Sequence, residues 1–196
     1  MTDTDAVLDL GPQTQVVARL AEGVTDEQLE DRTPCPEYRV RHLLGHLLGL
    51  SVAFRDAGRK DLGPTTDTSP EAAVPDVGPG WREELPKVLA ELAEAWRDPA
   101  AWTGMTRAGG VDLPGEVAAA VAVDELVIHG WDLARATGQS YEPDPTALQM
   151  AHDFLAAAAA EGDRGGGIFG PVVPVAPEAP LLDRAVGLSG RDPHWG

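Results

Sequence analysis

Histidine and carboxylate side chains stand one helical turn apart at two places in this sequence of 196 residues. His42 and His46 are four positions apart in a leucine-rich segment, and Glu125 and His129 are four positions apart in a later segment. In a helix, residues i and i+4 share one face, so each segment would present a pair of potential ligands on one side. Asp132 lies about one further turn along the face that carries His129.

Helical bundles build metal centres from these residue types. Inward-facing Glu and His side chains on facing helices can bind one divalent ion, and we predict His46, Glu125 and His129 as its ligands. Two imidazoles and one carboxylate leave coordination positions open, as in catalytic zinc sites. The ligand set suits Zn²⁺, and also Ni²⁺, Mn²⁺ or Fe²⁺, so the type of ligand alone does not fix the metal. His42 or Asp132 would orient a ligand imidazole through its second ring nitrogen.

A structural role is the alternative for each of these residues. A Glu–His pair at this spacing is common on solvated helix faces, and a single histidine on an apolar helix is more often a satisfied core residue than a ligand. His46 favours the metal interpretation because it stands among leucines, where an ionisable group needs a partner. Four small residues lie near the predicted ligands: Gly45, Gly49, Ala118 and Ala122. They would leave room for a substrate or simply allow close helix packing, and the sequence leaves both open.

The elements that must position these side chains are predicted to be helices. Apolar residues recur at helical spacing in five segments, at about 5–23, 40–56, 81–96, 114–137 and 145–160. Residues 57–80 and the link around Gly109-Gly110 are predicted as loops, and the best strand candidate, 102–106, is weak. Residues 161–196 are predicted to form an irregular tail that packs on the bundle, with a short helix at 181–188. The expected fold is all-α, with residues 1–196 as one domain.

Composition excludes several classes of function. The net charge of −17, from 32 acidic and 15 basic residues, would repel nucleic acid and anionic membranes. No apolar run approaches the ~20 residues that span a bilayer, and the acidic N-terminus is unlike a signal peptide. A single cysteine, Cys35, permits no disulfide within the chain and is predicted to be structural. We therefore expect a cytoplasmic protein, monomeric or homodimeric, that acts on a small molecule. His152 and His194 are expected at the surface.

Three segments resemble actinobacterial proteins of the DinB-like superfamily. They are TPCPEYRVRHLLGHLLG at 33–49, DELVIHGWDLARATGQ at 124–139 and LLDRAVGLSGRDPHW at 181–195. Their order and spacing agree with the signatures of that family, so the resemblance covers nearly the whole chain. Two positions depart from the signatures: His42 stands where the family usually has Asp, and Tyr38 where it usually has Trp.

The resemblance implies a fold, a site and an activity. The family includes the N-terminal domain of mycothiol-dependent maleylpyruvate isomerase, which implies a four-helix bundle with a crossover connection. It also implies a divalent metal, usually zinc, at His46, Glu125 and His129. The implied activity is a mycothiol-dependent S-transfer or isomerisation of a small electrophile, with mycothiol as the thiol cosubstrate. A metal-assisted hydrolase and a non-enzymatic protein that binds a small molecule or metal are the alternatives.

Overall fold

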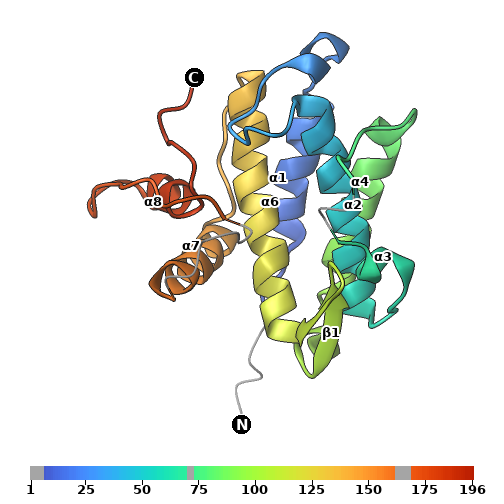
Figure 1. Cartoon of the computed structure of the whole chain (residues 1–196). Helices are drawn as coiled ribbons and strands as arrows, with labels where there is room; N and C mark the ends of the chain where they lie inside the picture. The colour runs from blue at the N-terminus through green and yellow to red at the C-terminus, as the bar shows by residue number, and fades with distance from the viewer. Residues whose placement is uncertain (1–6, 70–72, 162–168) are drawn as a thin grey trace.

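Four long helices form the centre of the molecule in the computed structural model, which describes residues 7–69, 73–161 and 169–196 (Figure 1). These helices are α1 (Gly11–Glu22), α2 (Val40–Arg59), α4 (Trp81–Ala95) and α6 (Gly115–Thr137). Helices α1 and α2 each pack against both α4 and α6, so the ring order is α1, α4, α2, α6. Consecutive α1 and α2 are therefore diagonal, and the chain between them crosses the end of the bundle. The predicted all-α, DinB-like bundle is confirmed.

Helix α2 carries the leucine-rich segment into the core. Leu43, Leu44 and Leu47 are all 0% exposed, because the apolar positions fall on faces that contact α4 and α6. The helix extends beyond the predicted end at 56 and stops at Arg59. Lys60 follows with a left-handed φ of 59°. Its ammonium group donates to the backbone carbonyls of Ala101 and Thr103, which compensates for this uncommon conformation.

Helix α6 is buried on several sides because α1, α2 and α7 (Pro145–Ala160) all pack on it. Ala118, Ala119 and Ala122 are 0% exposed, and their small side chains allow the neighbouring backbones to approach closely. Gly138 follows the last residue of the helix with a φ of 68°, the left-handed backbone that glycine adopts readily at a helix end. The predicted bounds of α6 are therefore correct to within one residue.

The connection into α6 is more regular than the sequence predicted. A short helix, α5 (Pro99–Trp102), is followed by an antiparallel hairpin of β1 (Met105–Ala108) and β2 (Val111–Pro114). Gly109 and Gly110 have φ values of 60° and 79°, which is the backbone that a two-residue hairpin turn requires. The link around Gly109-Gly110 was predicted as a loop, but it is a hairpin. The strand predicted at 102–106 lies instead at 105–108.

Two further short helices occupy segments between the bundle helices. The segment 57–80, predicted as a loop, contains α3 (Pro64–Asp67). Between α1 and α2 lies the 3₁₀ helix η1 (Asp26–Glu30). Its start carries a capping interaction, in which the Thr25 amide donates to Gln28 Oε1 at 3.1 Å.

The C-terminal part of the chain lies against one side of α6. Helix α7 packs on α6, and α8 (Leu181–Leu188) packs on α7, with Ala185 and Val186 fully buried (Figure 1). Residues 162–168 of the predicted tail lie outside the described residues. After α8 the chain returns to α6, where Arg135 Nε donates to the carbonyl of Trp195 at 3.1 Å. Among the described residues, no helix has both the length and the apolar character needed to cross a bilayer.

Candidate metal centre

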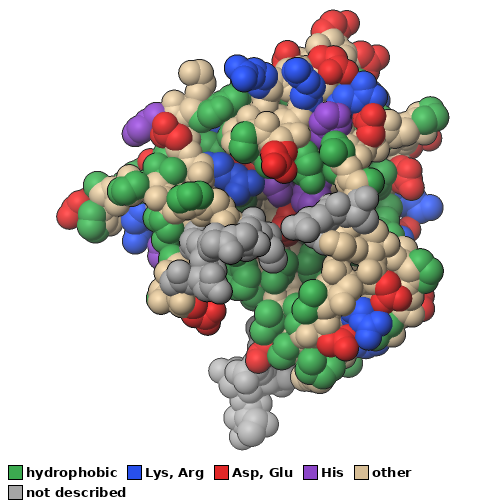
Figure 2. All heavy atoms as spheres, viewed as in Figure 1, with side chains coloured by type: hydrophobic (Ala, Val, Ile, Leu, Met, Phe, Trp, Pro, Cys, Tyr) green, Lys and Arg blue, Asp and Glu red, His purple; other side chains and the backbone are tan. Residues whose placement is uncertain are grey.

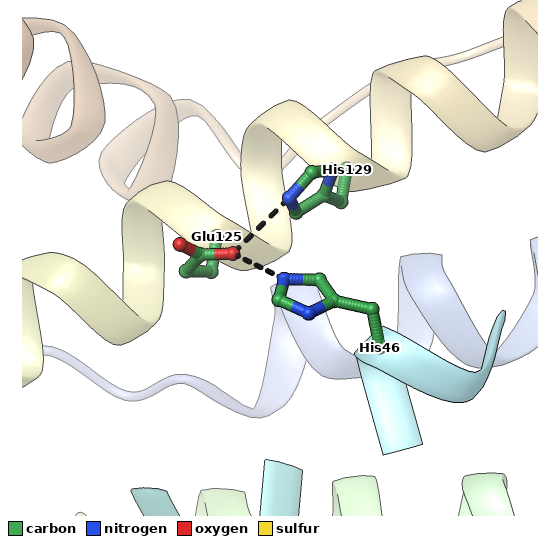
Figure 3. Close-up of side chains that lie close together, drawn as sticks. All are labelled: His46, Glu125 and His129. Carbon is green, nitrogen blue, oxygen red and sulfur yellow. Dashed lines mark hydrogen bonds and ion pairs between the residues drawn. The ribbon is translucent and has the colours of Figure 1, made fainter. Parts of the chain in front are cut away.

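The contact between α2 and α6 brings the three predicted ligands together (Figure 3). His46 points from α2 toward Glu125 and His129, which lie one turn apart on α6. The Nε2 atom of His46 is 3.0 Å from Glu125 Oε2, and the Nε2 atom of His129 is 3.2 Å from the same oxygen. The two imidazole rings meet edge to face, with centroids 4.8 Å apart. In the described part of the chain, these three residues form the one cluster of potential ligands.

The cluster is largely shielded from solvent. The side chains of His46, Glu125 and His129 are 15%, 16% and 10% exposed. Figure 2 shows histidine side chains only partly visible near the middle of the drawn face. Such groups attract a cation more strongly than exposed ones, because little water competes for them.

The spacing and the chemistry of these atoms fit one shared divalent ion. Ligand atoms bound at ~2.0–2.1 Å to a tetrahedral ion lie about 3.3 Å from one another. The nitrogen–oxygen separations of 3.0 and 3.2 Å are close to that value. The lone pairs of two imidazole nitrogens and a carboxylate oxygen would repel one another at this range. A metal ion or protons must therefore lie between them.

Asp132 holds the ring of His129 from the other side. Its Oδ2 lies 2.9 Å from His129 Nδ1, and the carboxylate is 0% exposed. When Nδ1 carries the proton and donates it to Asp132, the lone pair of Nε2 faces Glu125. Carboxylate partners of this kind fix the tautomer and the orientation of metal-binding histidines. Asp132 therefore stands where the sequence placed an orienting carboxylate.

His42 lies at the start of α2 and has a different partner. Its Nδ1 accepts a hydrogen bond of 3.3 Å from the backbone amide of Arg39, which caps the helix. The ring of Tyr38 lies between the two histidine rings of this helix, 6.5 Å from that of His42 and 5.4 Å from that of His46. The structure therefore gives His42 a capping contact in place of the predicted contact with a ligand imidazole.

The other candidate residues lie outside the cluster. His194 is exposed in the tail, as expected, whereas His152 on α7 is half-buried and its Nδ1 lies 3.2 Å from Asp153. Cys35 is also half-buried, and burial raises the pKa of its thiol. A raised pKa makes a thiol less reactive at neutral pH. This agrees with the structural role predicted for Cys35.

The charges at the centre are strongly coupled. Burial favours the neutral form of Glu125, but hydrogen bonds from His129 and His46 outweigh it and hold the pKa of Glu125 below its usual range. Burial likewise disfavours imidazolium at His129, yet the carboxylates of Asp132 and Glu125 raise its pKa to about 9. The site therefore binds positive charge, which a proton or a metal ion can supply.

Two residues that sequence reasoning missed also lie here. Arg191, in the tail, contacts the carboxylate of Asp132 with its Nε and Nη2 atoms. Asp124 is buried beside Glu125, and its Oδ1 has no hydrogen-bond partner. Burial and the neighbouring carboxylate of Glu125 raise the pKa of Asp124 well above its usual value. The sequence offered a signal only for Asp124, an acidic residue inside an apolar helix.

Comparison with known proteins identifies the family. The family model described as "Mycothiol maleylpyruvate isomerase N-terminal domain" matches residues 10–134. The chain belongs to this family. The matched residues include His46, Glu125, His129 and Asp132, so the whole ligand cluster lies within the shared domain. Arg191 lies beyond the match.

Two relatives of this family member come from Mycobacterium tuberculosis. They are the uncharacterized protein MT0763 of strain CDC 1551 / Oshkosh and the uncharacterized protein Rv0738 of strain ATCC 25618 / H37Rv. Each is 30% identical over 179 residues, an alignment that covers 89% of this chain and 91% of the relative. The likeness to both relatives therefore extends beyond the matched domain into the tail.

Two solved structures share the fold. One is the crystal structure of the mycothiol-dependent maleylpyruvate isomerase, with a TM-score of 0.54 and 20% identity. The other is a mutant of that isomerase, with a TM-score of 0.57 and 19% identity. Each alignment covers 73% of this chain and 65% of the solved chain, so this chain spans about two thirds of the isomerase. At this identity the likeness shows the helical fold alone.

Proposed function

We propose that this protein binds one divalent metal ion through His46, Glu125 and His129 and uses it in a thiol-dependent reaction of a small electrophile. One observation carries the metal part of the proposal. A single carboxylate oxygen, Glu125 Oε2, is approached by two imidazole nitrogens from different helices, at 3.0 and 3.2 Å. Zn²⁺ is the preferred ion for two imidazoles and one carboxylate, and Ni²⁺, Mn²⁺ and Fe²⁺ accept the same set.

The thiol part of the proposal comes from the family. The solved neighbours are named as mycothiol-dependent isomerases, and the matched family is named for the same activity. Three protein ligands leave a position on a tetrahedral ion for an external ligand. A bound divalent ion would supply a place where a thiol loses its proton near neutral pH. Mycothiol is accordingly the proposed cosubstrate.

The residues of the chain have separate parts in this proposal. His46 ties α2 to the centre, and Glu125 contributes the negative charge that offsets the ion. Asp132 contacts Nδ1 of His129, so that Nε2 is the ring nitrogen directed at the centre. In the transfer itself, a bond forms between sulfur and an electrophilic carbon of the substrate. With a halogenated electrophile the carbon–halogen bond breaks and halide leaves, and with an epoxide a carbon–oxygen bond breaks and the oxygen takes up a proton. With a maleyl compound, the proton lost by the thiol ends on the adjacent carbon, and reversing the addition after rotation about the carbon–carbon bond gives isomerisation.

The experiment combines metal analysis with a thiol-consumption assay. Purified protein, stripped with chelator and then reloaded, should hold about one ion per chain. It should consume mycothiol in the presence of epoxides or halogenated electrophiles and, with mycothiol present but not consumed, should isomerise maleyl compounds about their carbon–carbon double bond, and the chelated protein should do neither. Variants His46→Ala and His129→Ala should lose the ion, whereas His194→Ala, at an exposed position, should keep it. Equal rates with and without metal would reject the thiol mechanism and leave metal-assisted hydrolysis or simple binding to be tested.

A further inference from the structure

The C-terminal tail reaches the metal centre through one arginine. Arg191 follows α8 and lies 59 residues from Asp132 in the sequence. Its Nε lies 3.2 Å from Asp132 Oδ1, and its Nη2 lies 3.0 Å from Oδ2. The two side chains are 14% and 0% exposed, so this ion pair is buried. A third nitrogen, Nη1, donates to the carbonyl of Ser189 at 3.2 Å and fixes the guanidinium to its own segment.

The ion pair and the metal ligand share one atom. Asp132 Oδ2 lies 3.0 Å from Arg191 Nη2 and 2.9 Å from His129 Nδ1. His129 in turn faces Glu125 across 3.2 Å. An unbroken series of polar contacts therefore runs from the tail to the predicted ligands. The side chains of this series are at most 16% exposed, and a hydrogen bond or ion pair that is largely shielded from water is stronger than an exposed one.

We propose that Arg191 is a positioning residue for the metal centre, and that tail docking and metal binding stabilise each other through Asp132. The proposal rests on the proposed metal site and adds a residue and a segment to it. The planar guanidinium contacts both oxygens of the carboxylate, which prevents the carboxylate from rotating. A fixed carboxylate holds the imidazole of His129 with Nε2 directed at the centre.

Loss of Arg191 would change this arrangement in a definite way. The carboxylate of Asp132 is fully buried, and His129 would then be its one remaining ion-pair partner among the described residues. A buried charge that loses a partner moves toward solvent or draws water in. Either response turns the ring of His129 away from its present direction. The metal would then be held less tightly, although no ligand has been removed.

The coupling must act in both directions. If the tail raises the affinity of the centre for metal, bound metal must raise the stability of the docked tail by the same factor. This reciprocal effect is what distinguishes coupling from a tail that merely covers the site. It can be measured on the tail itself, by hydrogen exchange of a peptide that covers residues 181–196.

A second tail contact provides a matched control. Arg135, on the same helix as Asp132, donates to the carbonyl of Trp195. This contact also attaches the tail to α6, but Arg135 forms no hydrogen bond or ion pair with His46, Glu125 or His129. An Arg135→Ala variant therefore weakens the attachment of the tail without touching the residue that orients His129. Comparison with Arg191→Ala separates positioning from simple attachment.

The experiment measures Zn²⁺ affinity by competition with a chromophoric chelator, in parent, Arg191→Ala, Arg191→Lys and Arg135→Ala proteins. We expect Arg191→Ala to bind Zn²⁺ about tenfold more weakly, as for other residues behind a metal ligand. Arg191→Lys keeps the positive charge but cannot contact both oxygens of Asp132 as the planar guanidinium does. Its affinity for Zn²⁺ should therefore lie between those of Arg191→Ala and the parent. Arg135→Ala should match the parent. In Co²⁺-loaded protein, the visible spectrum should change in both Arg191 variants, more in Arg191→Ala than in Arg191→Lys, and should not change in Arg135→Ala.

The hydrogen-exchange arm tests the reciprocal effect. Zn²⁺ should slow exchange of peptide 181–196 in the parent and in Arg135→Ala, and should have no such effect in Arg191→Ala. Should Arg191→Ala fail to fold by circular dichroism, Arg191→Lys decides the matter, since the proposal requires a weaker site there too. Parent-like affinity and spectrum in the Arg191 variants would overturn this inference while the metal site stands. Equal losses in both arginine variants would also overturn it, and a parent that binds no metal would end both proposals.

Discussion

His46 Nε2 lies 3.0 Å from Glu125 Oε2, although 79 residues separate them in the chain. The contact joins α2 to α6, which are the two most hydrophobic of the four long helices. Because both groups are largely buried, neither can exchange its partner for water without opening the interface. The same contact that offers ligands to a metal therefore also ties together two core helices, and its loss affects both metal binding and stability.

Replacement of Glu125 by Gln should show how much the negative charge of this residue, as distinct from its size, contributes to metal binding. The amide has nearly the size of the carboxylate but lacks its negative charge, so a divalent ion loses its one anionic ligand. We expect metal affinity to fall by more than about tenfold, with the helical circular dichroism spectrum retained. Isothermal titration with Zn²⁺ measures the change. Thiol turnover in the assay described above should be lost as well.

Glu116→Gln supplies the control for this experiment. Glu116 lies in the first turn of the same helix, is exposed, and is outside the ligand cluster. The substitution removes the same charge from the same helix, so a general effect of net charge would appear in both variants. Metal affinity that is equal in the Glu125 and Glu116 variants would show that Glu125 is not a ligand.

The two glycines around His46 should respond differently to alanine. A Cβ at Gly45 would lie 2.7 Å from the backbone of Asp76, which cannot move aside like a flexible side chain. A Cβ at Gly49 would meet nothing within 4 Å. We expect Gly49→Ala to stabilise the protein by roughly 1 kcal/mol through helix propensity. Gly45→Ala should destabilise it, and urea unfolding of both variants is the measurement. Equal effects would mean that the segment at Asp76 does not press against α2.

This difference answers a question that the sequence left open. Gly45 permits close packing of the chain at Asp76, so the packing interpretation holds for this glycine, whereas Gly49 is exposed and packs against nothing. Spacing along one helix predicted which residues share a face, and it placed His46, Glu125 and His129 correctly on inward positions. It could not show that His42 caps α2, because spacing does not tell whether a side chain in the first turn bends back to the backbone of Arg39 or points toward a neighbouring helix.

Contacts between distant segments were beyond such reasoning. Arg191 lies 59 residues from Asp132, and no periodicity relates a residue of the tail to a residue of α6. The hairpin at 105–114 was missed for another reason. Its strands have four residues each and little apolar alternation, so the signal was confined to Gly109-Gly110. The long helices were predictable because burial against several neighbours imposes a repeated apolar pattern on them.

Metal affinity should rise with pH through the neutral range. The neighbouring carboxylates raise the pKa of His129 to about 9, so in chelator-stripped protein a proton occupies this imidazole at pH 7. A metal ion must displace that proton. We therefore expect the apparent Zn²⁺ affinity to increase from pH 6 to pH 9, by up to about tenfold per pH unit for one displaced proton. Calorimetry in buffers of different ionisation enthalpy would count the protons released. Release of no proton at pH 7 would contradict the prediction.

Whereas metal affinity should rise with pH, the free energy of unfolding of the metal-free protein should fall as pH rises above neutrality. The pKa of His129 rises on folding from 6.5 to about 9, so its contribution to stability is complete below pH 6.5 and is lost as pH rises toward 9. Glu125 has a lowered pKa, so its contribution is complete above its ordinary 4.5 and is lost as pH falls below that value. With respect to these two groups, stability should be greatest between pH 4.5 and 6.5.

Urea unfolding with chelator present at a series of pH values would test this profile. A His129→Gln variant cannot carry the charge, so its stability should lose the decline between pH 6.5 and 9. His194→Gln, at an exposed position, should keep the decline of the parent. Zn²⁺ should also remove the decline, because the ion replaces the proton between His129 and Glu125 and its binding strengthens as pH rises. If the decline persists in the His129 variant, another group causes it. The charge on His129 then does not contribute to the stability of the bundle.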